Sequence, residues 1–183
     1  MKIAIILGSS RPAGNTAHFV SELCKCTQHH MKVFDLTDYR VEPFDYDYKN
    51  QDDDFMPLMR EIISDYEIIL FASPVYWYSP SAQLKAFLDR LSDLLDIDKP
   101  LGRSLKGKYA GVIATGVQEN SPSCFEEIFK LTFSYLHLNY IGLQYCTYVD
   151  EKAELSDIAE QSLQLRNRLL EVEHNFEENT QYA

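Results

Sequence analysis

The sequence is poor in cysteine and has no long hydrophobic run. Its 183 residues include 4 cysteines, too few for the disulfide framework of a small secreted protein. The longest apolar runs, Ile3–Leu7 and Ile68–Ala72, are far shorter than the ~20 residues of a membrane-spanning helix. The first run is also shorter than the ~7–15 apolar residues of a signal peptide. We therefore expect a cytoplasmic protein.

Basic residues are also scarce: 17 Lys and Arg stand against 28 Asp and Glu, a formal net charge of −11. A surface this negative repels phosphate backbones and anionic lipids, so we expect neither a nucleic acid nor a membrane as a partner. With 45% hydrophobic and 25% charged residues, the composition is otherwise that of a globular protein. At this length we expect a single domain over residues 1–183.

Neither the cysteines nor the acidic residues have a metal-binding spacing. Cys24 and Cys26, followed by His29 and His30, depart from the Cys-x-x-Cys of common zinc sites. The acidic run Asp45–Asp54 lacks the central glycine and terminal glutamate of an EF-hand loop. We therefore expect thiols on a helix, a solvated loop and no metal site.

Apolar runs typical of strands alternate with segments whose apolar residues recur at helical spacing. Asn15 and the Ser-Pro pairs at 79–80 and 121–122 are suitable N-caps, which places helix starts there. Two further helices are expected from about Phe55 and from about Ala153 to Glu173. The expected strands are Lys2–Leu7, Met31–Leu36, Glu67–Ala72, Tyr109–Thr115 and Tyr140–Val149.

Five strands that alternate with five helices predict an α/β fold, a parallel sheet covered by helices on both faces. Right-handed crossovers give a doubly wound three-layer sandwich, with strand order 2-1-3-4-5. In such folds the ligand lies beyond the carboxyl ends of the strands. Three unusual loops fall at that edge.

The first loop is residues 8–16, with the sequence GSSRPAGNT. Its two glycines allow close approach of the backbone to a ligand, and its polar side chains gather at a helix N-terminus, which favours an anion. It matches neither the Walker loop nor the dinucleotide fingerprint. It therefore predicts a phosphate site, with a polar turn that binds nothing as the alternative.

The second loop, residues 73–80 with the sequence SPVYWYSP, contains three adjacent aromatic residues, including the single Trp. Because the first and third strands are neighbours in the predicted order, this loop opens onto the same crevice. Flat aromatic surface beside a phosphate site predicts a planar ring system with a phosphate tail, with an aromatic plug or partner surface as the alternative. The third loop, Ala114-Thr115-Gly116, offers a hydroxyl and close backbone approach.

Together the three loops resemble the NAD(P)H-dependent FMN reductase family of the flavodoxin-like superfamily. The segment Ser73–Leu88 is the most specific match, and the Gly-Ser-x-Arg-x-x-Gly-Asn-Thr form of the first loop supports it. The resemblance extends over essentially the whole chain in element order. It implies a flavodoxin-like domain with one FMN per subunit. The implied phosphate ligands are Ser9, Arg11, Asn15 and Thr16, and the implied ring contacts are Pro74, Val75, Tyr76, Trp77 and Ser79, with Thr115 and Gly116 on the far side.

The resemblance implies an oxidoreductase that takes hydride from NAD(P)H and reduces a small acceptor, such as free flavin or a quinone, by a ping-pong mechanism. The flavin carries this chemistry, so we assign no catalytic side chain. Backbone N–H groups of the second and third loops are candidates to stabilise developing negative charge. None of the five histidines falls in a crevice loop, and His18, just after the first loop, is interpreted as structural or exposed.

A flavodoxin-like electron-transfer protein without NAD(P)H activity is the alternative, and a non-enzymatic flavin or nucleotide binder is a third. The longer phosphate loop with Arg11 resembles the reductases, and the lack of cysteine in Tyr39–Asp54 disfavours an iron–sulfur flavoprotein. Members of the family commonly form dimers or tetramers, so we expect a homodimer or homotetramer. The acceptor, the choice of NADH or NADPH and the role of the acidic loop stay open.

Overall fold

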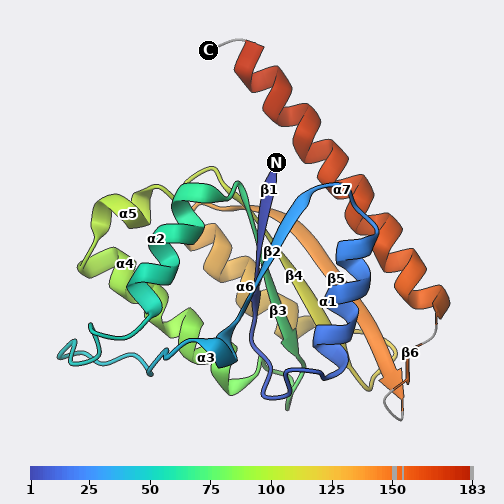
Figure 1. Ribbon diagram of the computed structural model, residues 1–183, viewed down its shortest axis with the longest axis horizontal. Helices are drawn as coiled ribbons and strands as arrows, with labels where there is room; N and C mark the ends of the chain where they lie inside the picture. The colour runs from blue at the N-terminus through green and yellow to red at the C-terminus, as the bar shows by residue number, and fades with distance from the viewer. Residues whose placement is uncertain (150–151, 154, 182–183) are drawn as a thin grey trace.

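A sheet of six strands forms the centre of the computed structural model, which describes residues 1–149, 152–153 and 155–181. The strand order is β2-β1-β3-β4-β5-β6, and the five longer strands run parallel (Figure 1). The predicted order 2-1-3-4-5 is therefore confirmed. The short β6, which pairs antiparallel with β5, was not expected from the sequence. The strands are β1 (Lys2–Leu7), β2 (His30–Asp35), β3 (Ile68–Pro74), β4 (Tyr109–Gly116), β5 (Asn139–Val149) and β6 (Lys152–Ala153).

Helices cover both faces of the sheet, and two separate hydrophobic clusters fill the layers between them and the strands. One face carries α1 (Asn15–Lys25) and α7 (Leu155–Gln181). The other carries α2 (Phe55–Asp65), α3 (Ala82–Asp89) and α6 (Ser123–Tyr135). Short helical segments complete it: η1 (Leu36–Asp38), η2 (Arg90–Ser92), α4 (Asp93–Asp96) and α5 (Lys99–Arg103). None of the described helices is long and apolar enough to cross a membrane.

Three predicted N-caps are wrong, by one or two residues each. Asn15 is the first residue of α1, and Gly14 before it makes no side-chain cap. Ser79 is held in a turn by exchanging backbone hydrogen bonds with Tyr76, so Ser81 caps α3 instead by accepting from the Leu84 N–H at 3.1 Å. Helix α6 begins at Ser123 without a side-chain cap. The expected long third helix is also divided, into α3, η2 and α4.

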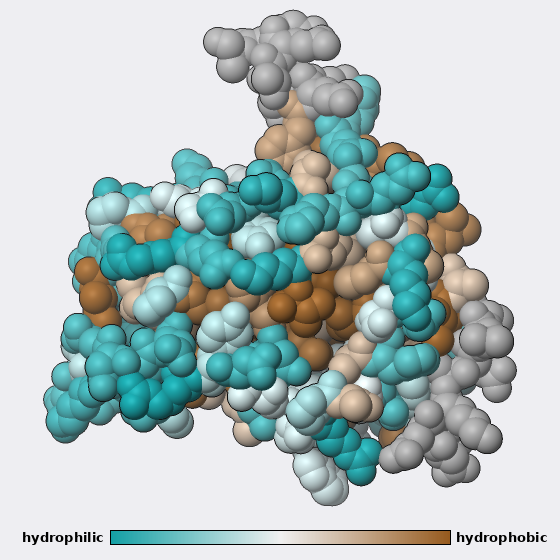
Figure 2. Space-filling model, in the orientation of Figure 1, coloured by the Kyte–Doolittle hydropathy of each residue, from teal (hydrophilic) through white to brown (hydrophobic). Residues whose placement is uncertain are grey.

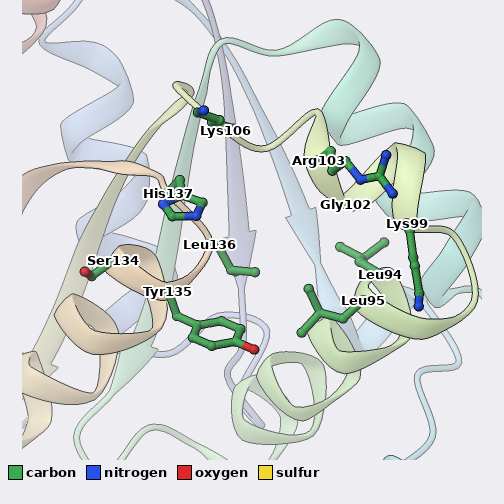
Figure 3. A pocket seen from close by; sticks show the side chains of 10 residues that line it. All are labelled: Leu94, Leu95, Lys99, Gly102, Arg103, Lys106, Ser134, Tyr135, Leu136 and His137. Atoms are coloured by element: carbon green, nitrogen blue, oxygen red, sulfur yellow. The ribbon is translucent and has the colours of Figure 1, made fainter.

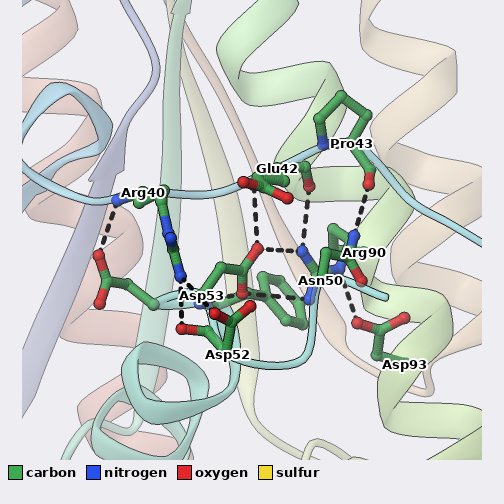
Figure 4. A network of polar contacts seen from close by, with 10 residues as sticks. Arg40, Glu42, Pro43, Asn50, Asp52, Asp53, Arg90 and Asp93 are labelled. Atoms are coloured by element: carbon green, nitrogen blue, oxygen red, sulfur yellow. Dashed lines mark hydrogen bonds and ion pairs between the residues drawn. The ribbon is translucent and has the colours of Figure 1, made fainter. Parts of the chain in front are cut away.

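The acidic loop 39–54 is anchored to the body of the protein by Arg90, whose side chain is fully buried (Figure 4). The guanidinium donates to the carboxylates of Asp53 and Asp93 and to the backbone oxygen of Glu42. Burial favours a higher pKa for Asp53, but Arg90 and the N–H groups of Glu42 and Phe55 outweigh it and lower the pKa overall. The loop forms a hydrophilic lobe in Figure 2.

Candidate functional site

The first loop brings buried hydroxyl groups to the carboxyl edge of the sheet. Ser9 and Thr16 are both buried, and the hydroxyl oxygens of Thr16 and Thr115 are 2.7 Å apart. The loop is curled on itself, because the Arg11 N–H donates to the Ser9 hydroxyl and the Gly14 N–H to the Arg11 carbonyl. Helix α1 starts where the loop ends, and the unbonded N–H groups of a first helical turn favour an anion. The loop therefore has the chemistry of a phosphate site.

Gly8 has a different role from the one that the sequence predicts. It is required by packing, since a Cβ at this position would lie 2.5 Å from the Cβ of Leu84 on α3. The carbonyl of Gly8 accepts from the Ser81 hydroxyl at 2.7 Å, and the Ser81 N–H donates to the Ser73 hydroxyl at 2.9 Å. The first and second loops are thus held together by hydrogen bonds beneath the surface.

A cavity of about 400 Å³ lies between the loops, beyond the carboxyl ends of β1, β3 and β4. Nine of the eleven predicted site residues line it: Ser9, Arg11, Asn15, Thr16, Pro74, Val75, Tyr76, Thr115 and Gly116. Arg11 is the single charged side chain among the described residues that line the cavity. The site is otherwise built from neutral hydroxyls, an amide, aromatic surface and backbone.

Trp77 and Ser79 do not line this cavity, in contrast to the prediction. Trp77 stands 92% exposed at the tip of the Tyr76–Ser79 turn and borders an adjoining cavity of about 180 Å³. The two cavities share Val75, Gly116 and Val117. Ser79 lines neither, because its backbone is used to close the turn. Trp77 and Tyr78 have φ of 49° and 65°, a left-handed conformation that is uncommon for bulky side chains.

The turn also limits which backbone N–H groups could face developing charge. The Val75 N–H donates to the Thr115 carbonyl at 2.8 Å, and those of Tyr76 and Ser79 donate across the turn. The prediction for these three groups is therefore wrong. The N–H groups of Trp77 and Tyr78 make no hydrogen bond within the described part of the chain.

Gly14, one of the two glycines expected to approach a ligand, also lines the cavity, as do Val117 and Tyr148, which were missed from the sequence. Tyr148 lies near the end of β5, and its hydroxyl is 2.9 Å from Nδ1 of His18. Burial raises the pKa of Tyr148, so its hydroxyl keeps its proton at neutral pH. The alternating pattern of side chains along β5 could have indicated Tyr148. It puts this residue at the carboxyl edge, on the face of the sheet that α1 covers, and therefore close to the first loop. His18 fits its structural interpretation.

Among the described residues, no group of three or more His, Cys, Asp or Glu side chains could hold a metal ion. Cys24 and Cys26 are free thiols, one half-buried and one exposed. None of the residues that line the cavity comes from the acidic loop 39–54.

The sequence matches the family model described as NADPH-dependent FMN reductase over residues 1–149. YwqN of Bacillus subtilis, whose name describes an NAD(P)H-dependent FMN-containing oxidoreductase, is 31% identical over 129 residues, 63% of this chain and 67% of YwqN. KefG of Escherichia coli, an ancillary protein of the glutathione-regulated potassium-efflux system, is 38% identical over 77 residues, 40% of this chain and 42% of KefG.

The fold is also similar to solved structures. The Trp repressor binding protein from Bacillus subtilis superposes with a TM-score of 0.69 at 22% identity, over 89% of this chain and 97% of that one. At this identity the likeness shows the fold alone, and the predicted flavodoxin-like sandwich is confirmed.

Proposed function

The chain belongs to the NADPH-dependent FMN reductase family, which uses FMN and NAD(P)H, and from this premise we propose that FMN binds in the 400 Å³ cavity. The proposed activity is the reduction of a small acceptor, free flavin or a quinone, with NAD(P)H as the electron donor. The observation that carries the proposal is the convergence of nine predicted residues, from three loops, around one cavity at the carboxyl edge.

The first loop fits the phosphate of FMN. Buried hydroxyls of Ser9 and Thr16, the N-terminus of α1 and the guanidinium of Arg11 together offer neutral donors and one positive charge. A phosphate group carries up to two negative charges and accepts several hydrogen bonds, so this donor set matches it. The protein binds and orients the anion here, while the net charge of the remaining surface is negative.

The second and third loops fit a flat ring. Pro74, Val75 and Tyr76 form one wall of the cavity, and Thr115 and Gly116 form another. FMN, when bound, supplies a centre that accepts hydride and passes electrons on. The N–H groups of Trp77 and Tyr78 are the remaining backbone donors of the turn that could stabilise charge there.

The adjoining cavity suits a second substrate. It shares Val75, Gly116 and Val117 with the first cavity and adds the exposed ring of Trp77. We propose that nicotinamide and acceptor occupy this position in turn, which makes the kinetics ping-pong. Trp77 then acts as a positioning residue beside the reacting ring rather than as a wall of the FMN cavity.

Exposed aromatic side chains surround the mouth of the site. Tyr76, Trp77 and Tyr78 are all exposed, and so is Val117. Residues of this kind are enriched at protein interfaces, so we propose a cytoplasmic homodimer or homotetramer with this surface at the subunit boundary. Sedimentation velocity of Trp77→Ser against the unchanged protein tests it. The proposal expects a smaller assembly for the variant, and a monomeric unchanged protein overturns it.

Anaerobic reduction tests the proposed activity directly. The purified protein is loaded with FMN, oxygen is removed, NADPH or NADH is added, and the visible absorbance of the flavin is followed. We expect bleaching that a quinone or air reverses. FMN binding without bleaching by either nucleotide would favour an electron-transfer protein, and absence of FMN binding would overturn the proposal. Parallel lines in double-reciprocal plots of initial rates would support the ping-pong scheme.

A further inference from the structure

A second cavity lies at the opposite edge of the sheet, just before β4 and β5 begin. Its volume is about 630 Å³, and it separates α4 and α5 on one side from the end of α6 on the other (Figure 3). Strands of seven or eight residues, at roughly 3.3 Å per residue, put it on the order of 20 Å from the cavity between the three loops. We call it the amino-edge cavity. It shares no lining residue with the proposed FMN site among the described residues.

The amino-edge cavity is positively charged in an acidic protein. Lys99, Arg103 and Lys106 line it together with His137, and none of the described residues that line it is acidic. The three cations form no ion pair within the part of the chain that the structure describes. In a chain with 28 acidic and 17 basic residues, such a cluster is a local reversal of the overall charge.

The nearest carboxylates in the sequence already have partners. Asp93 accepts from Arg90 at 2.6 Å, and Asp98 is paired with Arg60 at 2.8 Å. Asp96 accepts from the Tyr48 hydroxyl at 3.2 Å. Asp93 and Asp98 are therefore paired with arginines that do not line the cavity. Three positive charges remain to attract an anion from solution.

The floor and walls are apolar. Leu94 and Leu136 are buried beneath the cavity, while Leu95 and Tyr135 are 37% and 69% exposed beside it. In Figure 3 the ring of Tyr135 faces Leu95 across the lower part of the cavity. An exposed ring opposite a leucine is a surface on which a planar apolar group can pack.

The walls are fixed by close packing. Gly102 on α5 lies against α4, since a Cβ there would be 2.3 Å from the Leu94 carbonyl oxygen. At the other wall His137 follows the end of α6 with φ of 57°, in a position where glycine is usual. The His137 N–H donates to Ser134, and the Leu138 N–H to Phe133 at 2.9 Å, which closes the helix end. The closed helix end holds the imidazole at the edge of the cavity.

We propose that the amino-edge cavity binds a small organic anion in which a planar apolar body carries a phosphate group. The apolar body packs between Tyr135 and Leu95, and the phosphate lies near Arg103 and Lys106. Three cations in a cavity whose described lining contains no acidic residue favour a dianion over a monocarboxylate. The volume is in the range of small-molecule sites, about 300–1,000 Å³. Aryl phosphates and nucleoside phosphates share this chemistry.

Three probes separate the parts of the proposal: phenyl phosphate, inorganic phosphate and phenol. Each is titrated into isotopically labelled protein that carries one equivalent of FMN and no excess, and amide NMR shifts are followed. We expect phenyl phosphate to bind at least about tenfold more tightly than either fragment, because it uses both the cations and the apolar floor. Shifts at Gly102 and His137, with none at Gly14 and Asn15, assign the binding to the amino edge. AMP then tests whether a nucleoside phosphate also fits.

A matched pair of double variants tests the charge. Arg103→Gln with Lys106→Gln should weaken phenyl phosphate at least about tenfold, since two charge-assisted contacts are lost. Lys49→Gln with Lys85→Gln removes the same two charges from exposed ion pairs elsewhere and should leave the affinity unchanged. Tyr135→Ala should weaken phenyl phosphate but not inorganic phosphate.

Several results would overturn the proposal. If inorganic phosphate binds as tightly as phenyl phosphate, the apolar floor contributes nothing to binding. If phenol binds as tightly as phenyl phosphate, the cations contribute nothing. Equal losses of phenyl phosphate affinity in the two double variants would show that only the net charge of the protein matters, and not the cations of the cavity. The absence of saturable shifts at Gly102 and His137 would also overturn the proposal. If FMN fails to bind, the same titration is done on the protein without FMN. The amide shifts of Gly102 and His137 then still report binding at the amino edge.

Discussion

The two edges of the sheet offer different kinds of binding surface. At the carboxyl edge, buried hydroxyls such as those of Thr16 and Thr115 are bonded to one another, and Arg11 is the one charged side chain among the described residues of the cavity. At the amino edge, exposed cations surround an apolar floor and make no ion pairs in the described part of the chain. The first is organised before a ligand arrives. The second relies on charge and apolar area.

This difference predicts how each edge responds to its surroundings. Fixed, buried donors need little rearrangement on binding, whereas exposed charges are screened by salt over a Debye length of about 8 Å at physiological ionic strength. Binding at the amino edge should therefore weaken more steeply with salt than binding at the carboxyl edge. The following variants separate the two edges.

The largest expected effect is on the buried Arg90 network, which supports α4 at the amino edge. Asp53→Asn leaves the charge of Arg90 partly uncompensated, and breaking such a buried pair costs roughly 3–5 kcal/mol of unfolding free energy. Urea denaturation measures the loss. Asp52→Asn, on an exposed side chain of the same loop, is the control and should change stability by less than about 0.5 kcal/mol. A loss of similar size in both would contradict this account.

The same network gives a pH dependence of stability. Because the pKa of Asp53 is lower in the folded protein than in the unfolded chain, its contribution is full above the unfolded value, about 3.9. That contribution is lost as the pH falls through the lower folded value. Asp53→Asn should therefore show a shallower loss of unfolding free energy below about pH 4 than the unchanged protein. Identical slopes in urea titrations at each pH would contradict it.

Two closely packed glycines, one at each edge, allow the same substitution to be compared at both cavities. Gly8→Ala pushes against Leu84 at the carboxyl edge, and Gly102→Ala pushes against the Leu94 carbonyl at the amino edge. Each should cost about 1–3 kcal/mol of stability, because a closely packed backbone must shift. Gly8→Ala should weaken FMN and spare phenyl phosphate, and Gly102→Ala should do the reverse. Calorimetric titration of both ligands checks this, and a variant that weakens both equally would break the comparison.

The smallest effect is expected at a position outside both cavities. Gln144 on β5 is fully buried, and its amide atoms have no hydrogen-bond partner within the described residues. Gln144→Met should therefore raise the unfolding free energy by about 1 kcal/mol and leave both ligand affinities unchanged. Gln161→Met is the matched control, since Gln161 accepts from the Tyr145 N–H at 3.1 Å, and it should be destabilising. Destabilisation by Gln144→Met would reveal a partner for that amide.

Sequence reasoning recovered the strands and the positions of the three loops. Buried strands such as β3 read as continuous apolar runs, and parallel topology brings their carboxyl ends together. The helix start at Ser81 was missed because two serines flank Pro80, and only the Tyr76–Ser79 turn decides between them. The same turn puts Trp77 at its tip, beside the adjoining cavity, which the sequence does not indicate.

The sequence indicates only part of the amino-edge cavity. Lys99, Arg103 and Lys106 form a basic stretch at helical spacing, but no pattern connects them with Tyr135 and His137, which lie at the end of α6 and just after it. Packing of α5 against α4, which Gly102 allows, and the closed end of α6 bring them together. Such a site can be found only from the folded arrangement.

The most direct test of the central claim compares FMN with riboflavin, which lacks the phosphate. In Arg11→Ala we predict that FMN affinity falls about tenfold or more, from loss of a charge-assisted hydrogen bond, while riboflavin affinity changes little. Arg103→Ala, at the other edge, should change neither. Equal losses of FMN and riboflavin in Arg11→Ala, or an equal loss of FMN in Arg103→Ala, would contradict the assignment of the phosphate to the first loop.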